Sequence, residues 1–134
     1  MSPRLITIFA TGVGLLSLSV PSYSHHGTSI VYDLTQTITM SGTVTDFRFV
    51  NPHTIIYLDV HGEDGKVVSW LGGLSAQTSL SQREGWTKET LKPGDEIMVI
   101  GAPARGGAPS VYVQQLILNG EPLLQGLWTH DQTG

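Results

Sequence analysis

The stretch ITMSGTVTDFRF, residues 38–49, constrains the fold of this chain more than any other part of the sequence. Apolar and polar residues alternate through residues 38–44, which is typical of a strand with one buried face. After Asp46 the apolar residues shift by one position. A glycine inside a strand and a shift of this kind both favour a bulge, so Gly42 and the shift together predict a strongly curved strand.

Four further segments show strand patterns, and one shows a helix pattern. Asn51-Pro52 ends the first strand, because proline biases the preceding residue toward extended or turn geometry. A Gly-Glu-Asp-Gly turn joins the second and third strands, and Lys-Pro-Gly-Asp at 92–95 matches a type II turn. Ser75 is the predicted N-cap of the helix and Gly85 its C-terminal stop. The expected strands are residues 53–61, 66–71, 96–101 and 111–118, with the helix at 76–84.

Three strands, a short helix and two more strands follow the order of an OB-fold. The predicted fold class is therefore all-β with one short helix, arranged as a small OB-like Greek-key barrel, and the alternative is a β-sandwich. The barrel domain is assigned to residues 36–120. Residues 121–134 are assigned to a C-terminal tail.

The first 24 residues have the features of a secretory signal peptide. A single charge, Arg4, precedes an apolar run over residues 5–20, and Ser22-Tyr-Ser24 places small residues at the −3 and −1 positions of a cleavage site. The run is shorter than the roughly 18 to 20 residues of a membrane-spanning helix. We expect cleavage after Ser24, export through the general secretory route, and a periplasmic protein that begins with a His-containing segment, residues 25–35. The alternative is a retained membrane anchor.

Charge and composition exclude several classes of function. Without Arg4, six Lys and Arg face eleven Asp and Glu, a formal net charge of −5. This balance argues against nucleic-acid partners, which are bound largely through their phosphates, and against anionic membrane surfaces. The chain has no cysteine, which removes disulfides, thiolate nucleophiles and lipid attachment at a cysteine. No serine stands in a Gly-x-Ser-x-Gly motif, so a catalytic role is not indicated.

The adjacent histidines His25 and His26 are the most specific candidate site. If His25 is the mature N-terminus, its α-amine and its imidazole form one chelate with two nitrogen donors. A third histidine, His53, would complete a nitrogen site that favours Cu(II) among the late transition metals. The predicted function is a non-catalytic binding protein with copper or another late transition metal as its ligand. Oxidative chemistry at such a copper is a weaker alternative.

A second hypothesis is that a groove of the barrel binds the ligand or partner. Asn51, Trp70 and Arg105 would then contact a protein partner or a small apolar ligand, and the protein would be an accessory module. Each residue also has a plainer explanation: Asn51-Pro52-His53 as a turn, Trp70 as core, and Arg105 as a solvated loop charge. His61 and His130 are expected to be incidental.

Several motifs together resemble a bacterial family of exported proteins known as domain of unknown function 6152. They are His25-His26, Tyr32-Asp33, Asn51-Pro52-His53, Trp70, Gly85-Trp86-Thr87 and Leu91-Lys-Pro-Gly-Asp95. The resemblance implies a small exported β-barrel of Gram-negative bacteria and brings no established activity. The family usually carries a glutamate two residues after the strand-three tryptophan, where this chain has Gly72. A site that needed this carboxylate would be lost here.

Overall fold

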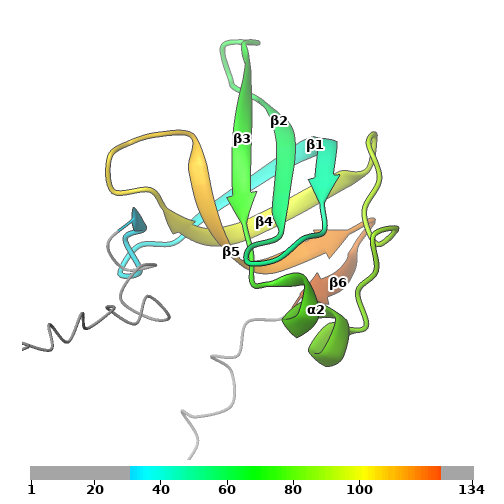
Figure 1. The fold of residues 1–134 in the computed structure, drawn as a ribbon. Helices are drawn as coiled ribbons and strands as arrows, with labels where there is room; N and C mark the ends of the chain where they lie inside the picture. The colour runs from blue at the N-terminus through cyan, green and yellow to red at the C-terminus, as the bar shows by residue number, and fades with distance from the viewer. Residues whose placement is uncertain (1–30, 125–134) are drawn as a thin grey trace, which may run out of the picture.

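The computed structural model of the chain describes residues 31–124. Within these residues it forms the six strands and the helix α2 named below (Figure 1). The predictions for the leader, for His25 and His26, and for His130 lie outside the described residues. The elements are β1 (Ile38–Arg48), β2 (Ile55–His61), β3 (Val67–Gly73), α2 (Gln77–Glu84), β4 (Glu96–Pro103), β5 (Ser110–Leu118) and β6 (Glu121–Leu124).

The strands form one sheet in the order β3-β2-β1-β4-β5-β6. All neighbours are antiparallel, and an additional parallel pairing of β3 with β5 closes the first five strands into a barrel. This closed barrel, with its single short helix between β3 and β4, confirms the predicted OB-like fold. The β-sandwich alternative is wrong, because the sheet closes on itself.

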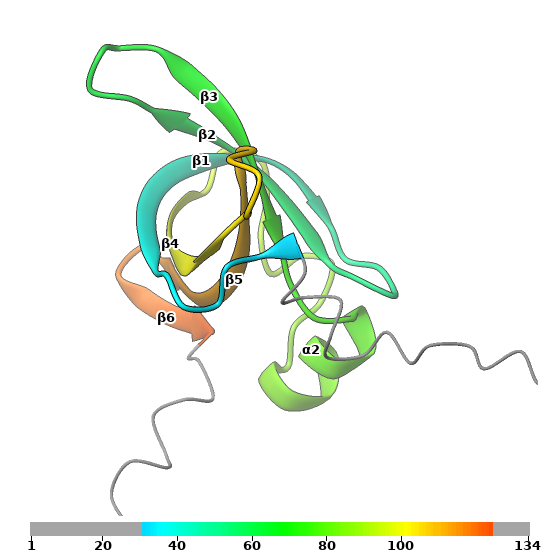
Figure 2. The same cartoon turned by 90° about the vertical axis from the view of Figure 1, so that its left-hand side faces the viewer.

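β1 curves around the barrel as its sequence predicts, and pairs with β2 on one side and β4 on the other (Figure 2). A bulge between Val44 and Asp46 accounts for the shift in the apolar pattern. Gly42 is buried where β1 pairs with β2, and a Cβ at this position would lie 2.6 Å from the backbone oxygen of Asp59. The glycine is therefore required by the close approach of the two strands.

The predicted turns are present at both places. Gly65 has a φ of 78°, and the Gly65 N–H donates to the Gly62 carbonyl over 3.0 Å in the turn between β2 and β3. In the turn before β4, Gly94 has a φ of 96° and the Asp95 N–H donates to the Lys92 carbonyl over 3.1 Å. Glycine populates this region of φ without steric cost, which explains the residue type at each turn.

The helix α2 ends as predicted but begins differently. Gly85 ends it with a φ of 70°. Ser75 does not cap it: the N-cap residue is Ala76, and no side chain of the N-cap itself bonds to the helix. Instead the loop between β1 and β2 supplies the acceptors. The Val50 carbonyl accepts from the Gln77 N–H over 3.1 Å, and Asn51 Oδ1 accepts from the Thr78 N–H over 3.3 Å.

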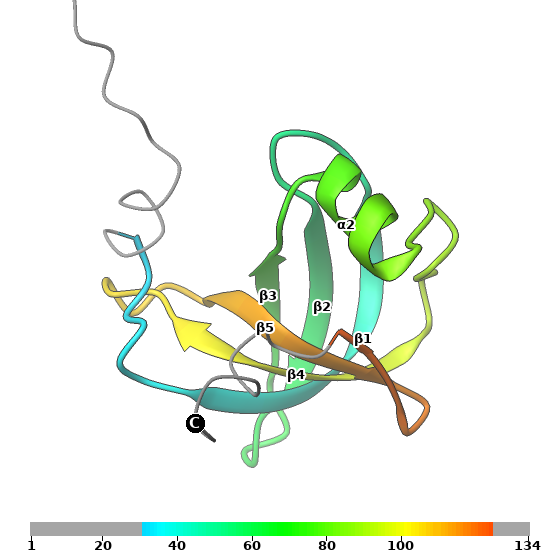
Figure 3. The same cartoon turned by 90° about the horizontal axis from the view of Figure 1, so that it is seen from below.

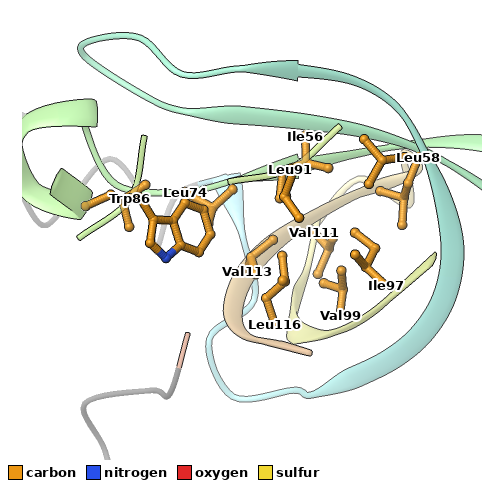
Figure 4. Close-up of a cluster of buried hydrophobic side chains, with 12 residues drawn as sticks. Ile56, Leu58, Leu74, Trp86, Leu91, Ile97, Val99, Val111, Val113 and Leu116 are labelled. Carbon is orange, nitrogen blue, oxygen red and sulfur yellow. The ribbon is translucent and has the colours of Figure 1, made fainter. Parts of the chain in front are cut away.

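The core fills the barrel and extends under α2 (Figure 4). Inward residues of the strands occupy the barrel interior, and α2 with its flanking segments adds Leu74, Leu80, Trp86 and Leu91. Trp86 packs edge-on against Phe47, and its Nε1–H donates to the Leu123 carbonyl over 3.2 Å. The strand members of this cluster are Val44, Ile56, Leu58, Ile97, Val99, Val111, Val113 and Leu116.

Residues 121–124 form β6, although the sequence assigned them to the tail. β6 pairs antiparallel with β5 and carries the Leu123 carbonyl that Trp86 binds. The strand boundaries also differ by a few residues: β2 begins two residues later than expected, and β3 and β4 each extend two residues further. Within residues 31–124 no helix is long and apolar enough to cross a membrane.

Candidate functional site

Tyr32 fastens the chain segment that precedes β1 to the loop between β4 and β5. Its backbone forms an isolated antiparallel bridge with Ala104. The hydroxyl groups of Tyr32 and Ser110 share a hydrogen bond of 3.0 Å, and the Tyr32 ring lies 5.8 Å from that of Tyr112. The Arg105 N–H donates to the Val31 carbonyl over 3.0 Å. Figure 3 shows this segment beside the β4–β5 loop.

Asp33 continues this attachment and organises the turn that leads into β1. Its N–H donates to the Pro103 carbonyl over 2.8 Å. Its Oδ1 accepts from the Thr35 hydroxyl over 2.6 Å and from the Thr35 N–H over 3.1 Å. The Thr35 side chain, then the Thr35 backbone, hold the pKa of the Asp33 carboxyl below its ordinary value. Within residues 31–124, Asp33 therefore stabilises the turn that leads into β1.

The Tyr32 side chain extends over the end of β3. A Cβ at Gly73 would lie 3.2 Å from the Tyr32 hydroxyl oxygen, so a larger residue here would require the Tyr32 side chain to shift by a few tenths of an ångström. Gly73 pairs with Ile55 at the beginning of β2, and His53 precedes Ile55 by two residues. Paired antiparallel residues have Cα atoms about 5 Å apart and a strand rises about 3.3 Å per residue, so the His53 Cα lies within about 17 Å of the Tyr32 hydroxyl.

His53 is exposed in the loop between β1 and β2, which lies against α2. Its neighbour Thr54 is fully buried, and the Thr54 N–H donates to the Ser75 carbonyl over 3.1 Å. The backbone around His53 is thus fixed while the imidazole faces solvent. Within residues 31–124 no group of three His, Asp or Glu side chains is placed to hold a metal ion.

The three residues predicted to line a groove lie on different elements. Asn51 contacts the first turn of α2. Trp70 is half-buried, sits opposite the fully buried Leu58, and packs against the core. Arg105 is exposed in the β4–β5 loop, where its charge contributes to lowering the pKa of Asp33.

Gly72 faces the barrel interior. It is buried, and a Cβ there would lie 3.0 Å from Val113 Cγ2. A carboxylate at this position would point into the core and not toward the exposed side of the sheet. The departure from the family pattern at Gly72 therefore concerns barrel packing.

The outward face of β1 and β2 carries a polar cluster that sequence reasoning missed. The Arg48 guanidinium lies 5.1 Å from the Tyr57 ring centroid and its Nε–H donates to Asp46 Oδ2 over 3.1 Å. Nearby, the Ser69 hydroxyl donates to Asp59 Oδ1 over 2.8 Å. The only sequence signal was alternation, which places these residues on one face once the bulge is known.

Comparisons with known proteins give a family and a fold. A family model described as "Family of unknown function (DUF6152)" matches residues 12–111. No curated protein shows significant similarity to the chain.

Solved structures match the fold at low identity. A TiaS mutant lacking its ZRD, crystallised with agmatine, matches 71% of this chain at 13% identity and a TM-score of 0.45, and the chain spans only 23% of its length. The mitochondrial single-stranded DNA-binding protein Rim1 of S. cerevisiae matches 63% at 11% identity and a TM-score of 0.48, with 94% of its own chain covered. A small single-stranded DNA-binding protein of Streptomyces coelicolor matches 63% at 17% identity and a TM-score of 0.43, with 92% covered.

Proposed function

This chain belongs to the family of unknown function DUF6152, and we propose that it is an exported, non-catalytic binding protein of the periplasm that holds copper or another late transition metal. Its ligands would be the α-amine and imidazole of His25, with His26 and His53. The attachment of Tyr32 beside the end of β3 carries the proposal. It holds Tyr32 near Gly73 at the end of β3, and Gly73 pairs with Ile55, two residues after the exposed His53.

The reach of the chain sets a requirement on this arrangement. An extended segment from His26 to Val31 spans up to about 17 Å. The proposal therefore requires that the His53 imidazole lie within this reach of Val31.

The ligand types set the metal and its pH dependence. Nitrogen donors in a planar arrangement favour Cu(II) over calcium or magnesium. An α-amine with an ordinary pKa near 8 and imidazoles with an ordinary pKa near 6.5 must lose their protons to bind. Affinity should therefore fall as the pH is lowered from about 8 to about 5.

Copper titration of four forms of the mature chain tests the proposal. They are the native chain beginning at His25, the same chain with one extra N-terminal alanine, His53→Ala, and His61→Ala. His61 is the matched control, because it is an exposed histidine at the other end of β2. Electron paramagnetic resonance then counts the nitrogen ligands in each complex.

We expect the alanine extension to change the spectrum and His53→Ala to remove one nitrogen, while His61→Ala leaves the site intact. The spectrum is needed beside the affinity, because the extension makes His26 the third residue and creates a different copper chelate. The proposal fails if the native chain binds copper no better than a peptide of residues 25–33, or if His53→Ala changes nothing.

The alternative function, an accessory module that binds a partner or an apolar ligand through Asn51, Trp70 and Arg105, has less support. Asn51 is engaged with α2 and Trp70 with the core.

Intact-mass analysis of periplasmic material tests export separately, and should show a chain that starts at His25. A chain that retains residues 5–20 would contradict export with cleavage.

A further inference from the structure

The first half of β3 is an open sheet edge among the residues that the structure describes. β5 pairs only with Leu71–Gly73, while β2 covers the other side of β3 over its whole length. Figures 1 and 2 show the β2–β3 hairpin projecting beyond the closed barrel. Val67 and Val68 on this edge are 50% and 45% exposed.

The backbone groups on this edge point away from the sheet. The Leu71 N–H donates to the Pro109 carbonyl on the β5 side, so the Leu71 backbone faces away from β2. Backbone direction alternates along a strand, and in the described chain the N–H and C=O groups of Val67 and Ser69 therefore face the same open side. Such a row of groups is a template for pairing with another strand.

The sequence of this edge lacks the features that usually block pairing. Residues 67–71, VVSWL, contain no charge and no proline. β6, which also pairs on one side only, begins with Glu121 and Pro122. Proteins commonly protect an open edge with charged residues or proline, so within residues 31–124 the β3 edge lacks a protection that β6 has.

We propose that a second copy of this chain pairs antiparallel with the β3 edge, across a two-fold axis at Val68. In this register Val67 of each copy exchanges two hydrogen bonds with Ser69 of the other. The two Val68 side chains then meet. This inference is independent of the proposed metal site.

Charge favours a second copy as the occupant. In the antiparallel register the hairpin turn of one copy, with Glu63 and Asp64, comes to the start of β5 in the other. The adjoining β4–β5 loop carries Arg105 as its only charge. Arg105 of each copy, whose charge also acts on Asp33 of its own chain, then has the two carboxylates of the partner's turn nearby, and the uncharged strand segments face each other. The paired edge is short, so we expect a weak dimer that depends on concentration.

Disulfide trapping tests the register directly, because the chain has no cysteine of its own. Opposed residues of a non-hydrogen-bonded antiparallel pair have Cα atoms about 4.5 Å apart, which a disulfide spans. Val68→Cys should therefore give a covalent dimer under mild oxidation. Val67→Cys should give much less, since the two Val67 residues lie diagonally about 7 to 8 Å apart. Met98→Cys, 39% exposed on β4, is the control for random collision.

Sedimentation velocity over roughly a hundredfold range of concentration tests the same axis without a covalent bond. The native chain should shift toward a dimer as concentration rises, while Val68→Lys and Val68→Glu should each stay monomeric. Mixing the two variants should restore the dimer, because opposite charges then face each other across the axis. A native chain that is monomeric throughout, a mixture that does not associate, or equal trapping of all three cysteine variants would overturn the proposal. Val68→Lys that still dimerises would overturn it as well.

Discussion

Asn51 and His53 are two residues apart in one loop and have different roles. Asn51 Oδ1 accepts a hydrogen bond from the backbone of α2, whereas the His53 side chain is exposed. The motif Asn-Pro-His therefore combines a structural residue with a candidate ligand. Sequence reasoning weighed a turn against a site for the whole motif, and the structure separates the two by residue.

Asn51→Ala should destabilise the protein by about 1 kcal/mol, because the Thr78 N–H at the start of α2 loses its acceptor. Asn51→Asp should retain most of the stability, since a carboxylate oxygen accepts equally well at a helix N-terminus. Urea unfolding of both variants, with His53→Ala as the neighbouring control, measures the effect. An Asn51→Ala midpoint equal to that of His53→Ala would contradict the assigned contact.

Asp33 makes one contribution to stability dependent on pH. Its pKa is lowered in the folded chain, chiefly by the Thr35 hydroxyl. The contribution is therefore fully present above the ordinary carboxyl pKa near 3.9 and is lost as the pH falls through the lowered folded value. Asp33→Asn should remove this part of the pH dependence, which lies below about pH 5, measured as the difference in unfolding midpoint from the native chain. An identical pH profile for the two proteins would count against it.

Among the elements, β1 was the easiest to predict from sequence and β6 the hardest. β1 is long, and its alternation, Gly42 and apolar shift all indicate the same curved strand. β6 has four residues, includes Pro122, and depends on its pairing with β5 and on the bond from Trp86. The start of α2 was misplaced for a related reason, since its capping oxygen comes from Asn51 and not from the local sequence. Contacts between distant segments determine where β6 forms and where α2 begins, and the local sequence does not show these contacts.

The candidate site could be predicted only in part for the same physical reason. Residue type identified the histidines. The position of Tyr32 over Gly73, which relates the N-terminal segment to His53, depends on close approach between segments about 40 residues apart in the chain. The spacing of residues along the sequence does not predict that these two segments lie close together. The motif Tyr32-Asp33 was noticed, but its function as an attachment to the β4–β5 loop was not.

Gly42→Ala tests the curvature of β1. The added Cβ would lie 2.6 Å from the Asp59 backbone oxygen, so β1 and β2 must separate, and we expect a loss of about 1 to 3 kcal/mol. Gly106→Ala is the control, because Gly106 has no atoms within 4 Å of an added Cβ and no positive φ. Thermal unfolding of the two variants should differ clearly. Equal melting temperatures would mean that the Cβ added at residue 42 does not force β1 and β2 apart.

As a whole, the molecule combines a barrel type that often binds oligonucleotides with a charge that opposes them. The chain has seven Lys and Arg against eleven Asp and Glu. On the outward face of β1 and β2, Arg48 is paired with Asp46 and lies over Tyr57, so the aromatic ring is not open for a base to stack. We therefore expect both sources of affinity for single strands, stacking and phosphate contacts, to be weak in this protein.

We therefore predict no binding of single-stranded DNA, even at low salt where phosphate contacts are strongest. Fluorescence anisotropy of a labelled oligothymidine, titrated with the native chain, should stay flat. Asp46→Ala is the informative variant, because it removes one repelling carboxylate and releases Arg48 from its ion pair. If the face were a nucleic-acid site held back only by this pair, the variant would gain affinity that falls steeply with salt. A flat titration for both proteins is expected, since the charge of the whole chain and not one ion pair opposes phosphate, and binding by the native chain would contradict the prediction.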